Sequence, residues 1–163
     1  MPEGIKLAEA ASMDATELLE RDHREVEDLL KQYEAAVKDG DQTVKEDLAE
    51  EICEALTVHA AIEEEVFYPA VAEQVEGTED LVEEAKKEHA AVKRLVEDIE
   101  STDASDPQYD GLVRELGASV THHVEEEEGE MFPKVRESGL DLQGLGQRMS
   151  ERKTALLGEE VPE

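Results

Sequence analysis

Four segments of this chain place apolar residues at alternating intervals of three and four, and this spacing constrains the fold more than any other feature. The segments cover about residues 15–38, 42–75, 80–100 and 108–136. Residues at this spacing lie on one face of an α-helix, so each segment predicts a helix with a single buried stripe. Short polar or glycine-containing connections separate the segments. The sequence therefore predicts an all-α fold: an up-down-up-down four-helix bundle with a short C-terminal helical tail.

Capping and breaking residues mark the ends of these helices. Asp14, with Glu17 three residues later, matches a capping box at the start of the first helix. Pro69 should kink the second helix or end its regular part, because proline lacks a backbone N–H. The predicted domains are an N-terminal lead over residues 1–13, the bundle over 14–137, and a glycine-containing tail over 138–163 with a short helix at about 149–157.

Each predicted helix carries a histidine within its apolar stripe, and two of the helices add a glutamate one turn later. A buried, unpaired carboxylate is costly or becomes neutral, so these His–Glu pairs need a cation or strong partners. A single buried histidine is more often a hydrogen-bonded core residue, but four on facing stripes with two glutamates favour a metal site. The candidate ligands are His23, His59, Glu63, His89, His123 and Glu127.

The positions of the histidines along the helices agree with this interpretation. His23 lies 17 residues before Gly40 and His59 lies 19 residues after it. At a rise of about 1.5 Å per residue, both lie at a similar distance from that turn. His89 and His123 are placed similarly about the loop at residues 101–107.

A weak internal repeat divides the chain into two halves. Each half supplies a histidine preceded by an acidic residue, and then a histidine, a glutamate and a proline at fixed spacing. These elements are Asp22-His23 and His59-x3-Glu63-x5-Pro69 in the first half, and Glu88-His89 and His123-x3-Glu127-x5-Pro133 in the second.

The repeat also separates His123 from its neighbour His122. His122 and Glu126 have the same i, i+4 spacing, but they match neither the apolar stripe nor the distance to the following proline. We therefore interpret His122 as a residue that flanks the site or contacts a ligand. Asp22 and Glu88 are either ordinary surface acids or residues that orient ligands.

Composition restricts the partners of the chain. The formal net charge of −29 argues against nucleic acid and against anionic membrane surfaces, which both attract basic residues. The single cysteine, Cys53, excludes an internal disulfide framework, and no apolar run approaches the roughly 20 residues of a membrane span. Residues 1–11 carry charges where a signal peptide would be apolar, so a cytoplasmic location is expected by default. Phosphate-binding loops, nucleophile elbows and cysteine-based zinc patterns are not found.

At the candidate ligands the sequence resembles the hemerythrin-like HHE cation-binding family, over about residues 14–137. The matching motifs are Asp22-His23, His59-Ala-Ala-Ile-Glu63-Glu64 before Tyr68-Pro69, Glu88-His89, and His123-Val-Glu-Glu-Glu127 before Phe132-Pro133. The resemblance implies two iron ions, joined by an oxo or hydroxo bridge, that meet oxygen, peroxide or nitric oxide. It also implies that Glu63 and Glu127 bridge the irons and that the four histidines are terminal ligands.

One position departs from the hemerythrins that carry oxygen reversibly. Those proteins have a further histidine one turn after the one on the third helix, and here that position is Lys93. Because a charged lysine cannot bind a metal, water fills the position or a nearby carboxylate or tyrosine substitutes. Glu64 and Glu126 are the closest acids in register, whereas Tyr68 is interpreted mainly as a packing residue. The remaining six ligands are similar to those of the hemerythrin-like domain of an F-box iron and oxygen sensor.

Three functional hypotheses follow. The first is a protein that binds iron and senses or reacts with oxygen, peroxide or nitric oxide; mixed imidazole and carboxylate ligands suit iron better than zinc. The second is a peroxide-decomposing enzyme of the catalase or peroxidase kind, and the third is a metal-free structural bundle. The first two use the same ligands and differ in access and redox potential, so the sequence does not separate them.

The charge of the chain leads to a first prediction. A surplus of one sign this large destabilises the compact state by self-repulsion, and salt screens that repulsion. Added sodium chloride should therefore raise the melting temperature measured by circular dichroism. A melting temperature that does not change with salt would contradict a fully solvated acidic surface.

Overall fold

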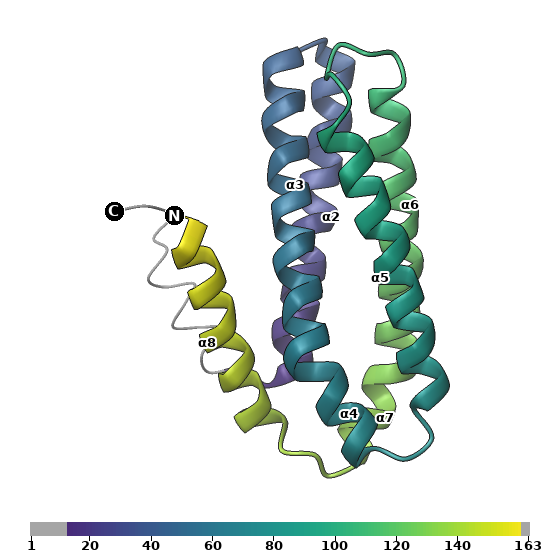
Figure 1. Cartoon of the computed structure of the whole chain (residues 1–163), viewed down its shortest axis with the longest axis vertical. Coiled ribbons are helices and arrows are strands. Elements are labelled where there is room, and N and C mark those ends of the chain that lie inside the picture. The colour runs from purple at the N-terminus through teal and green to yellow at the C-terminus, as the bar shows by residue number, and fades with distance from the viewer. Residues whose placement is uncertain (1–12, 161–163) are drawn as a thin grey trace.

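A computed structural model describes residues 13–160, and the regular secondary structure within those residues is entirely helical. Four long helices lie alongside one another (Figure 1): α2 (Ala15–Asp39), α3 (Gln42–Ile62), α5 (Glu79–Glu100) and α6 (Tyr109–Glu126). The predicted all-α fold is confirmed. The predicted N-terminal lead lies outside the described residues apart from Met13. None of the helices in this part of the chain combines the length and apolarity needed to cross a membrane.

The first helix begins as the sequence predicts. The Asp14 carboxylate accepts a hydrogen bond of 2.9 Å from the Glu17 backbone N–H, and the Glu17 carboxylate accepts one of 3.1 Å from the Asp14 N–H. The helix ends at Gly40, whose φ of 68° lies in the left-handed region that favours glycine. This turn carries the chain directly into α3.

Two of the long helices continue through a short π-helical stretch. α3 passes through η1 (Glu63–Phe67) into α4 (Tyr68–Gln74), and α6 passes through η2 (Glu127–Met131) into α7 (Phe132–Glu137). In each case the backbone N–H before the proline reaches the carbonyl five residues back. The expected irregularity at Pro69 therefore takes the form of a wider turn that starts at a candidate ligand.

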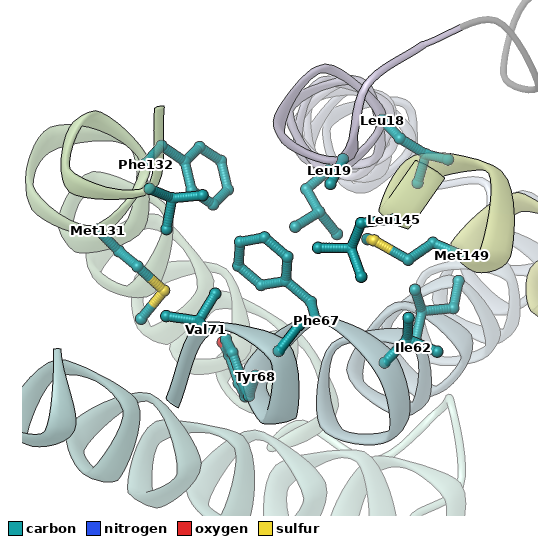
Figure 2. Packing of buried hydrophobic residues seen from close by; sticks show 14 of the residues in the cluster. Leu18, Leu19, Ile62, Phe67, Tyr68, Val71, Met131, Phe132, Leu145 and Met149 are labelled. Atoms are coloured by element: carbon teal, nitrogen blue, oxygen red, sulfur yellow. The ribbon is translucent and has the colours of Figure 1, made fainter. Parts of the chain in front are cut away.

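Two apolar clusters fill the interior. One lies around α4, α7 and the C-terminal helix, where the rings of Phe67 and Phe132 meet edge to face with centroids 5.8 Å apart (Figure 2). The other includes Tyr33, Ile52 and Leu116, and it lies among α2, α3, α5 and α6. Buried polar side chains separate the two clusters, and they are the candidate ligands.

The C-terminal helix α8 (Leu142–Glu160) is longer than the short helix expected at about 149–157. It begins before Gly144 and packs against α2 and α3 (Figure 1), where it buries Leu145 and Met149. Gly146 allows this close approach. A Cβ atom there would lie 2.8 Å from the Asp14 carbonyl carbon and 2.9 Å from the Ala15 nitrogen.

This contact predicts the effect of adding one methyl group. Gly146→Ala should destabilise the protein by about 1–3 kcal/mol, because the methyl group meets rigid backbone of α2. Gly111→Ala in α6 is the matched control, since a Cβ there meets nothing within 4 Å. Urea unfolding should show the Gly111 variant to be as stable as the wild type or more stable. Equal stability of the two variants would contradict this packing of α8.

Candidate metal centre

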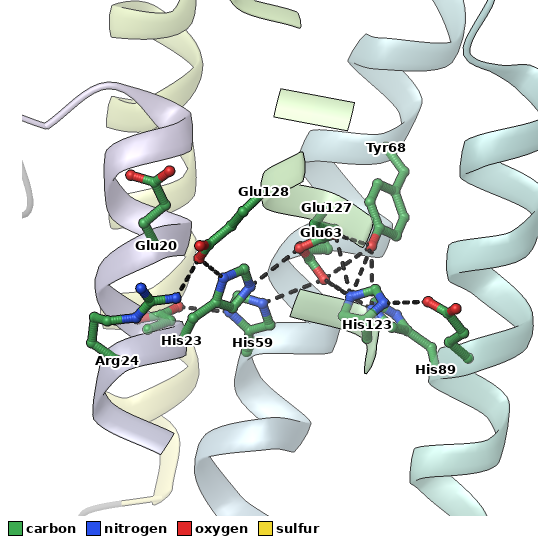
Figure 3. Close-up of polar contacts among 12 residues, drawn as sticks. Glu20, His23, Arg24, His59, Glu63, Tyr68, His89, His123, Glu127 and Glu128 are labelled. Atoms are coloured by element: carbon green, nitrogen blue, oxygen red, sulfur yellow. Dashed lines mark hydrogen bonds and ion pairs between the residues drawn. The ribbon is translucent and has the colours of Figure 1, made fainter. Parts of the chain in front are cut away.

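The four histidines predicted from the stripes lie in one layer across the bundle. Each comes from a different long helix, and each is at most 7% exposed. They form two pairs (Figure 3), with ring centroids 5.0 Å apart for His23 and His59 and 4.9 Å apart for His89 and His123. The structure therefore brings together residues that are up to 100 positions apart in the chain.

Glu63 lies between the two histidine pairs. Its Oε1 atom is 3.4 Å from His59 Nε2 and 2.8 Å from His89 Nε2, and the side chain is fully buried. Burial raises the pKa of Glu63, but the surrounding histidines outweigh burial and hold it well below the usual range. Glu63 is therefore a carboxylate shared by both histidine pairs.

Glu127 also faces both pairs, with a different oxygen toward each. Its Oε1 is 3.2 Å from His23 Nε2, and its Oε2 is 3.3 Å from His123 Nε2. The donor atoms form two clusters, each compact enough for one cation, and Glu63 belongs to both. These clusters are His23, His59, Glu63 and Glu127, and Glu63, His89 and His123.

The Tyr68 hydroxyl lies at this centre, although the sequence favoured a packing role. It donates to Glu127 Oε2 and lies 3.1 Å from Glu63 Oε1 and 3.4 Å from His89 Nε2. Because the π-helical turn bonds residue i to i+5, it stacks Tyr68 above Glu63 on the same side of the helix. Burial, followed by the nearby carboxylates, raises the pKa of Tyr68 well above its usual range, so the hydroxyl is protonated in the metal-free chain.

A carboxylate accepts a hydrogen bond at Nδ1 of each histidine, at 2.6–2.9 Å. The pairs are Glu128 with His23, Asp22 with His59, Glu64 with His89, and Glu88 with His123. An acceptor at Nδ1 fixes the proton there and directs the Nε2 lone pair toward the interior. Every imidazole is therefore oriented with Nε2 toward the interior, and its neutral form would carry the proton on Nδ1.

These contacts decide between the two interpretations of Asp22 and Glu88. Both orient a histidine, but the histidine belongs to the next long helix rather than to the adjacent position. Glu128 likewise accepts a hydrogen bond from His23 Nδ1. The internal repeat holds the signal for it, because Glu128 follows Glu127 as Glu64 follows Glu63.

Two cationic side chains support the carboxylates that bind His23 and His59. Arg24 donates to Glu128 at 2.6 Å, and Lys153 from α8 donates to Asp22 at 2.7 Å. Burial raises the pKa of Asp22, but the hydrogen bond from His59 and the Lys153 ammonium outweigh burial and lower it. Lys153 could not be predicted, because no local pattern in the sequence places the C-terminal tail against Asp22.

Several buried atoms at the centre make no hydrogen bond of good geometry, although His23 Nε2 lies 3.2 Å from Glu127 and His59 Nε2 lies 3.4 Å from Glu63. Within the described residues, four of the five such side-chain atoms are His23 Nε2, His59 Nε2, Glu63 Oε2 and Glu127 Oε1. Buried polar atoms are normally paired, and unpaired ones cost about 1–3 kcal/mol each. Imidazole nitrogens and carboxylate oxygens that converge in this way fit one or two divalent cations.

The protonation of the metal-free centre follows from the same contacts. Burial lowers the pKa of His59, but Glu63 and Asp22 outweigh burial and raise it to about 10. Glu127 and Glu63 similarly overcome burial and raise the pKa of His123 to about 12. A metal that binds here therefore displaces protons from imidazole nitrogens, so metal affinity should rise with pH.

A cavity of about 30 Å³ lies on the other side of the histidines from Tyr68. Its apolar lining includes Val26, Leu56, Val92 and Val120, each one turn from a histidine toward the Gly40 end of the bundle. A volume of this size holds one or two molecules as small as water. The histidine layer therefore has carboxylates and Tyr68 on one side and a small apolar space on the other.

Lys93 and His122 lie outside the centre, as the sequence predicts. Lys93 is exposed and lines a hollow between α3 and α5 beside His89. His122 is 62% exposed and lies 3.3 Å from carboxylate oxygens of both Glu88 and Glu126. The i, i+4 spacing alone would not have separated His122 from His123.

Comparison with known proteins gives consistent results. The family model described as the hemerythrin HHE cation binding domain matches residues 14–135. The crystal structure of a hemerythrin HHE cation binding domain-containing protein from Mycobacterium kansasii superposes with a TM-score of 0.75 and 25% identity, covering 90% of this chain and 89% of that one. A protein named DNA nickase from a Nostoc species is 32% identical over 124 residues, which cover 76% of this chain. The match spans 34% of the length of that relative.

The geometry predicts which substitutions remove a bound metal. Glu63→Ala and His123→Ala should lose iron and lower stability, because each removes donors from the interior centre and leaves its partners buried. His122→Ala should keep the interior iron. The difference is measured as the iron content per chain, after loading with ferrous iron and removal of loosely bound iron on a chelating resin. Equal iron loss in the two histidine variants would mean that the assignment of His123, rather than His122, as the ligand is wrong.

Proposed function

We propose that this chain, which belongs to the hemerythrin HHE cation-binding domain family, holds two iron ions within an up-down-up-down four-helix bundle and binds or senses oxygen, peroxide or nitric oxide. The family binds metal cations, and the histidine and glutamate clusters of this chain fit that property. The observation that carries the proposal is the group of four buried, unpaired donor atoms that converge from three helices. Imidazole and carboxylate donors together suit iron.

The two clusters of donor atoms support one iron each. His23 and His59 would bind the first iron, and His89 and His123 would bind the second. Glu63 and Glu127 would bridge them, since Glu63 belongs to both clusters and Glu127 turns one oxygen toward each histidine pair. Two bridging carboxylates also offset much of the charge of two cations.

Tyr68 is the proposed substitute for the histidine that is absent at Lys93. Its hydroxyl lies 3.4 Å from His89 Nε2 and 3.5 Å from His123 Nε2, within the cluster proposed for the second iron. A bound cation favours the ionised form of a group that ligates it, which would offset the raised pKa of this phenol. Lys93 itself is exposed and leaves the position free.

Bound iron would supply the redox chemistry and an open position for a small ligand. The residues of the chain have three separate tasks around it. The carboxylates at Nδ1 hold each imidazole in place, and the apolar residues that include Val26 and Leu56 limit the ligand to a small molecule and exclude bulk water. Tyr68, which lies between Glu63 and Glu127, would complete the ligands of the second iron. Desolvation of this kind strengthens each polar interaction in the site.

The cavity favours binding or sensing, because its apolar lining and volume of about 30 Å³ suit a diatomic molecule. A peroxide-decomposing enzyme is the second candidate, and the Tyr68 hydroxyl favours it. Peroxide breakdown needs a group that gives and takes a proton, and this hydroxyl is buried among carboxylates and histidines. A metal-free structural bundle fits less well, since it would leave the four donor atoms unpaired.

The activity named for the Nostoc relative is not part of this proposal. That protein is about three times as long as the matched segment, and the net charge of −29 opposes contact with nucleic-acid phosphates. We also propose a cytoplasmic location, which is consistent with the single cysteine, Cys53, since disulfide-rich chains are typical of oxidising compartments.

Metal content and peroxide consumption test the proposal together. The protein loaded anaerobically with ferrous iron should retain about two irons per chain by elemental analysis. Oxidation in air should then produce the visible absorption of ferric iron. Rapid, repeated consumption of added peroxide would favour the enzyme, whereas a stoichiometric response would favour the binding protein. A chain that retains no iron after anaerobic loading would refute the proposal.

A further inference from the structure

A separate cluster of metal-binding side chains lies on the surface where α5 meets α6. It contains Glu88 from α5 and the pair His122 and Glu126 from α6. His122 Nε2 lies 3.3 Å from Glu88 Oε2 and 3.3 Å from Glu126 Oε2. Because the His122 side chain is 62% exposed, a cation can reach these atoms directly from solvent.

The distances between the donor atoms match a coordination shell. Nitrogen and oxygen ligands about 2.0–2.1 Å from a tetrahedral metal lie about 3.3 Å from each other. We propose that Glu88, His122 and Glu126 form a peripheral site for one divalent transition-metal cation. This peripheral site is distinct from the interior centre and does not depend on which metal fills that centre.

A buried oxygen without a partner points to the same ligand. Glu88 Oε2 is the fifth buried side-chain atom that lacks a hydrogen bond among the described residues, and it is the oxygen that faces His122. The other oxygen, Oε1, is occupied by His123 Nδ1 at 2.7 Å. A cation at the peripheral site would satisfy the unpaired oxygen without disturbing the bond to His123.

The first half of the repeat shows which groups contact the two oxygens of the equivalent carboxylate. Asp22 corresponds to Glu88, and it gives one oxygen to His59 and the other to the Lys153 ammonium. Lys153 comes from α8, which packs on α2 and α3 (Figure 1), so the equivalent carboxylate of the second half receives an imidazole instead of an ammonium. In the second half, no lysine ammonium of the described residues contacts this carboxylate oxygen.

The chemistry of the three side chains selects the class of cation. An imidazole with two carboxylates suits zinc or ferrous iron, whereas magnesium and calcium prefer oxygen ligands alone. Three protein ligands leave a coordination position for water, as in open zinc sites. Glu88 would connect such a cation to His123 through its two oxygens.

A diffuse attraction of cations to the acidic surface is the alternative, and a matched pair of variants separates it from a defined site. Glu126→Gln removes a carboxylate of the peripheral site. Glu125→Gln removes the same charge one residue away, from an exposed side chain that makes no ion pair or hydrogen bond within the described residues. The iron-loaded full chain and both variants would be titrated with zinc by calorimetry, in millimolar magnesium to saturate diffuse binding.

The wild type and Glu125→Gln should each bind one zinc ion more per chain than Glu126→Gln. Zinc should also shift the imidazole proton signals of His122 in the wild type, assigned by their absence in His122→Ala. Equal zinc stoichiometry in the two glutamate variants, or His122 signals that do not move, would overturn the proposal. All of these positions are at the surface, and circular dichroism of each variant would confirm that the bundle is intact.

Discussion

A layer of carboxylates and imidazoles crosses the middle of this bundle, and the need to satisfy it shapes the rest of the structure. Glu63 and Glu127 are essentially inaccessible to solvent. Some of their oxygen atoms, and some of the imidazole nitrogens beside them, make no hydrogen bond within the described residues. Such a layer is expensive in an apolar interior unless a cation completes it. The carboxylates at Nδ1, the π-helical stretches and the apolar clusters above and below can all be understood as support for that layer.

The two halves of the chain provide this support in a similar way, and one difference between them comes from outside the four long helices. Each half contributes an acid before its first histidine and another after its buried glutamate, and each acid binds a histidine of a different helix. This cross-linking ties all four long helices to one level. The difference is α8, which lies against the first half and adds Lys153 there. The approximate symmetry of the site is therefore broken from outside the bundle.

The parts of this structure that depend on local periodicity were predictable from the sequence. The apolar stripes predicted the helices. The register of the stripe and the distance to the following proline predicted that His123, and not His122, faces the interior. The position of the Tyr68 hydroxyl was not predicted, because a regular helix would turn it away from Glu63, and the sequence indicated an irregularity at Pro69 without indicating a wider turn. Lys153 and the full length of α8 were missed for a related reason, since a weakly amphipathic tail becomes a helix by packing on α2 and α3. The six ligand assignments and the domain boundaries stay predictions.

The separation of the core into two apolar clusters has a consequence for the cooperativity of unfolding. Apolar contacts couple the residues within each cluster, but the layer between them consists of polar groups whose mutual attraction depends on what they bind. Without a metal we expect the two ends of the bundle to behave as two folding units that are less tightly coupled, each able to open locally. A cation held by all four helices would join the two units into one. Metal binding at the centre would then slow amide hydrogen exchange as far away as the ends of the helices.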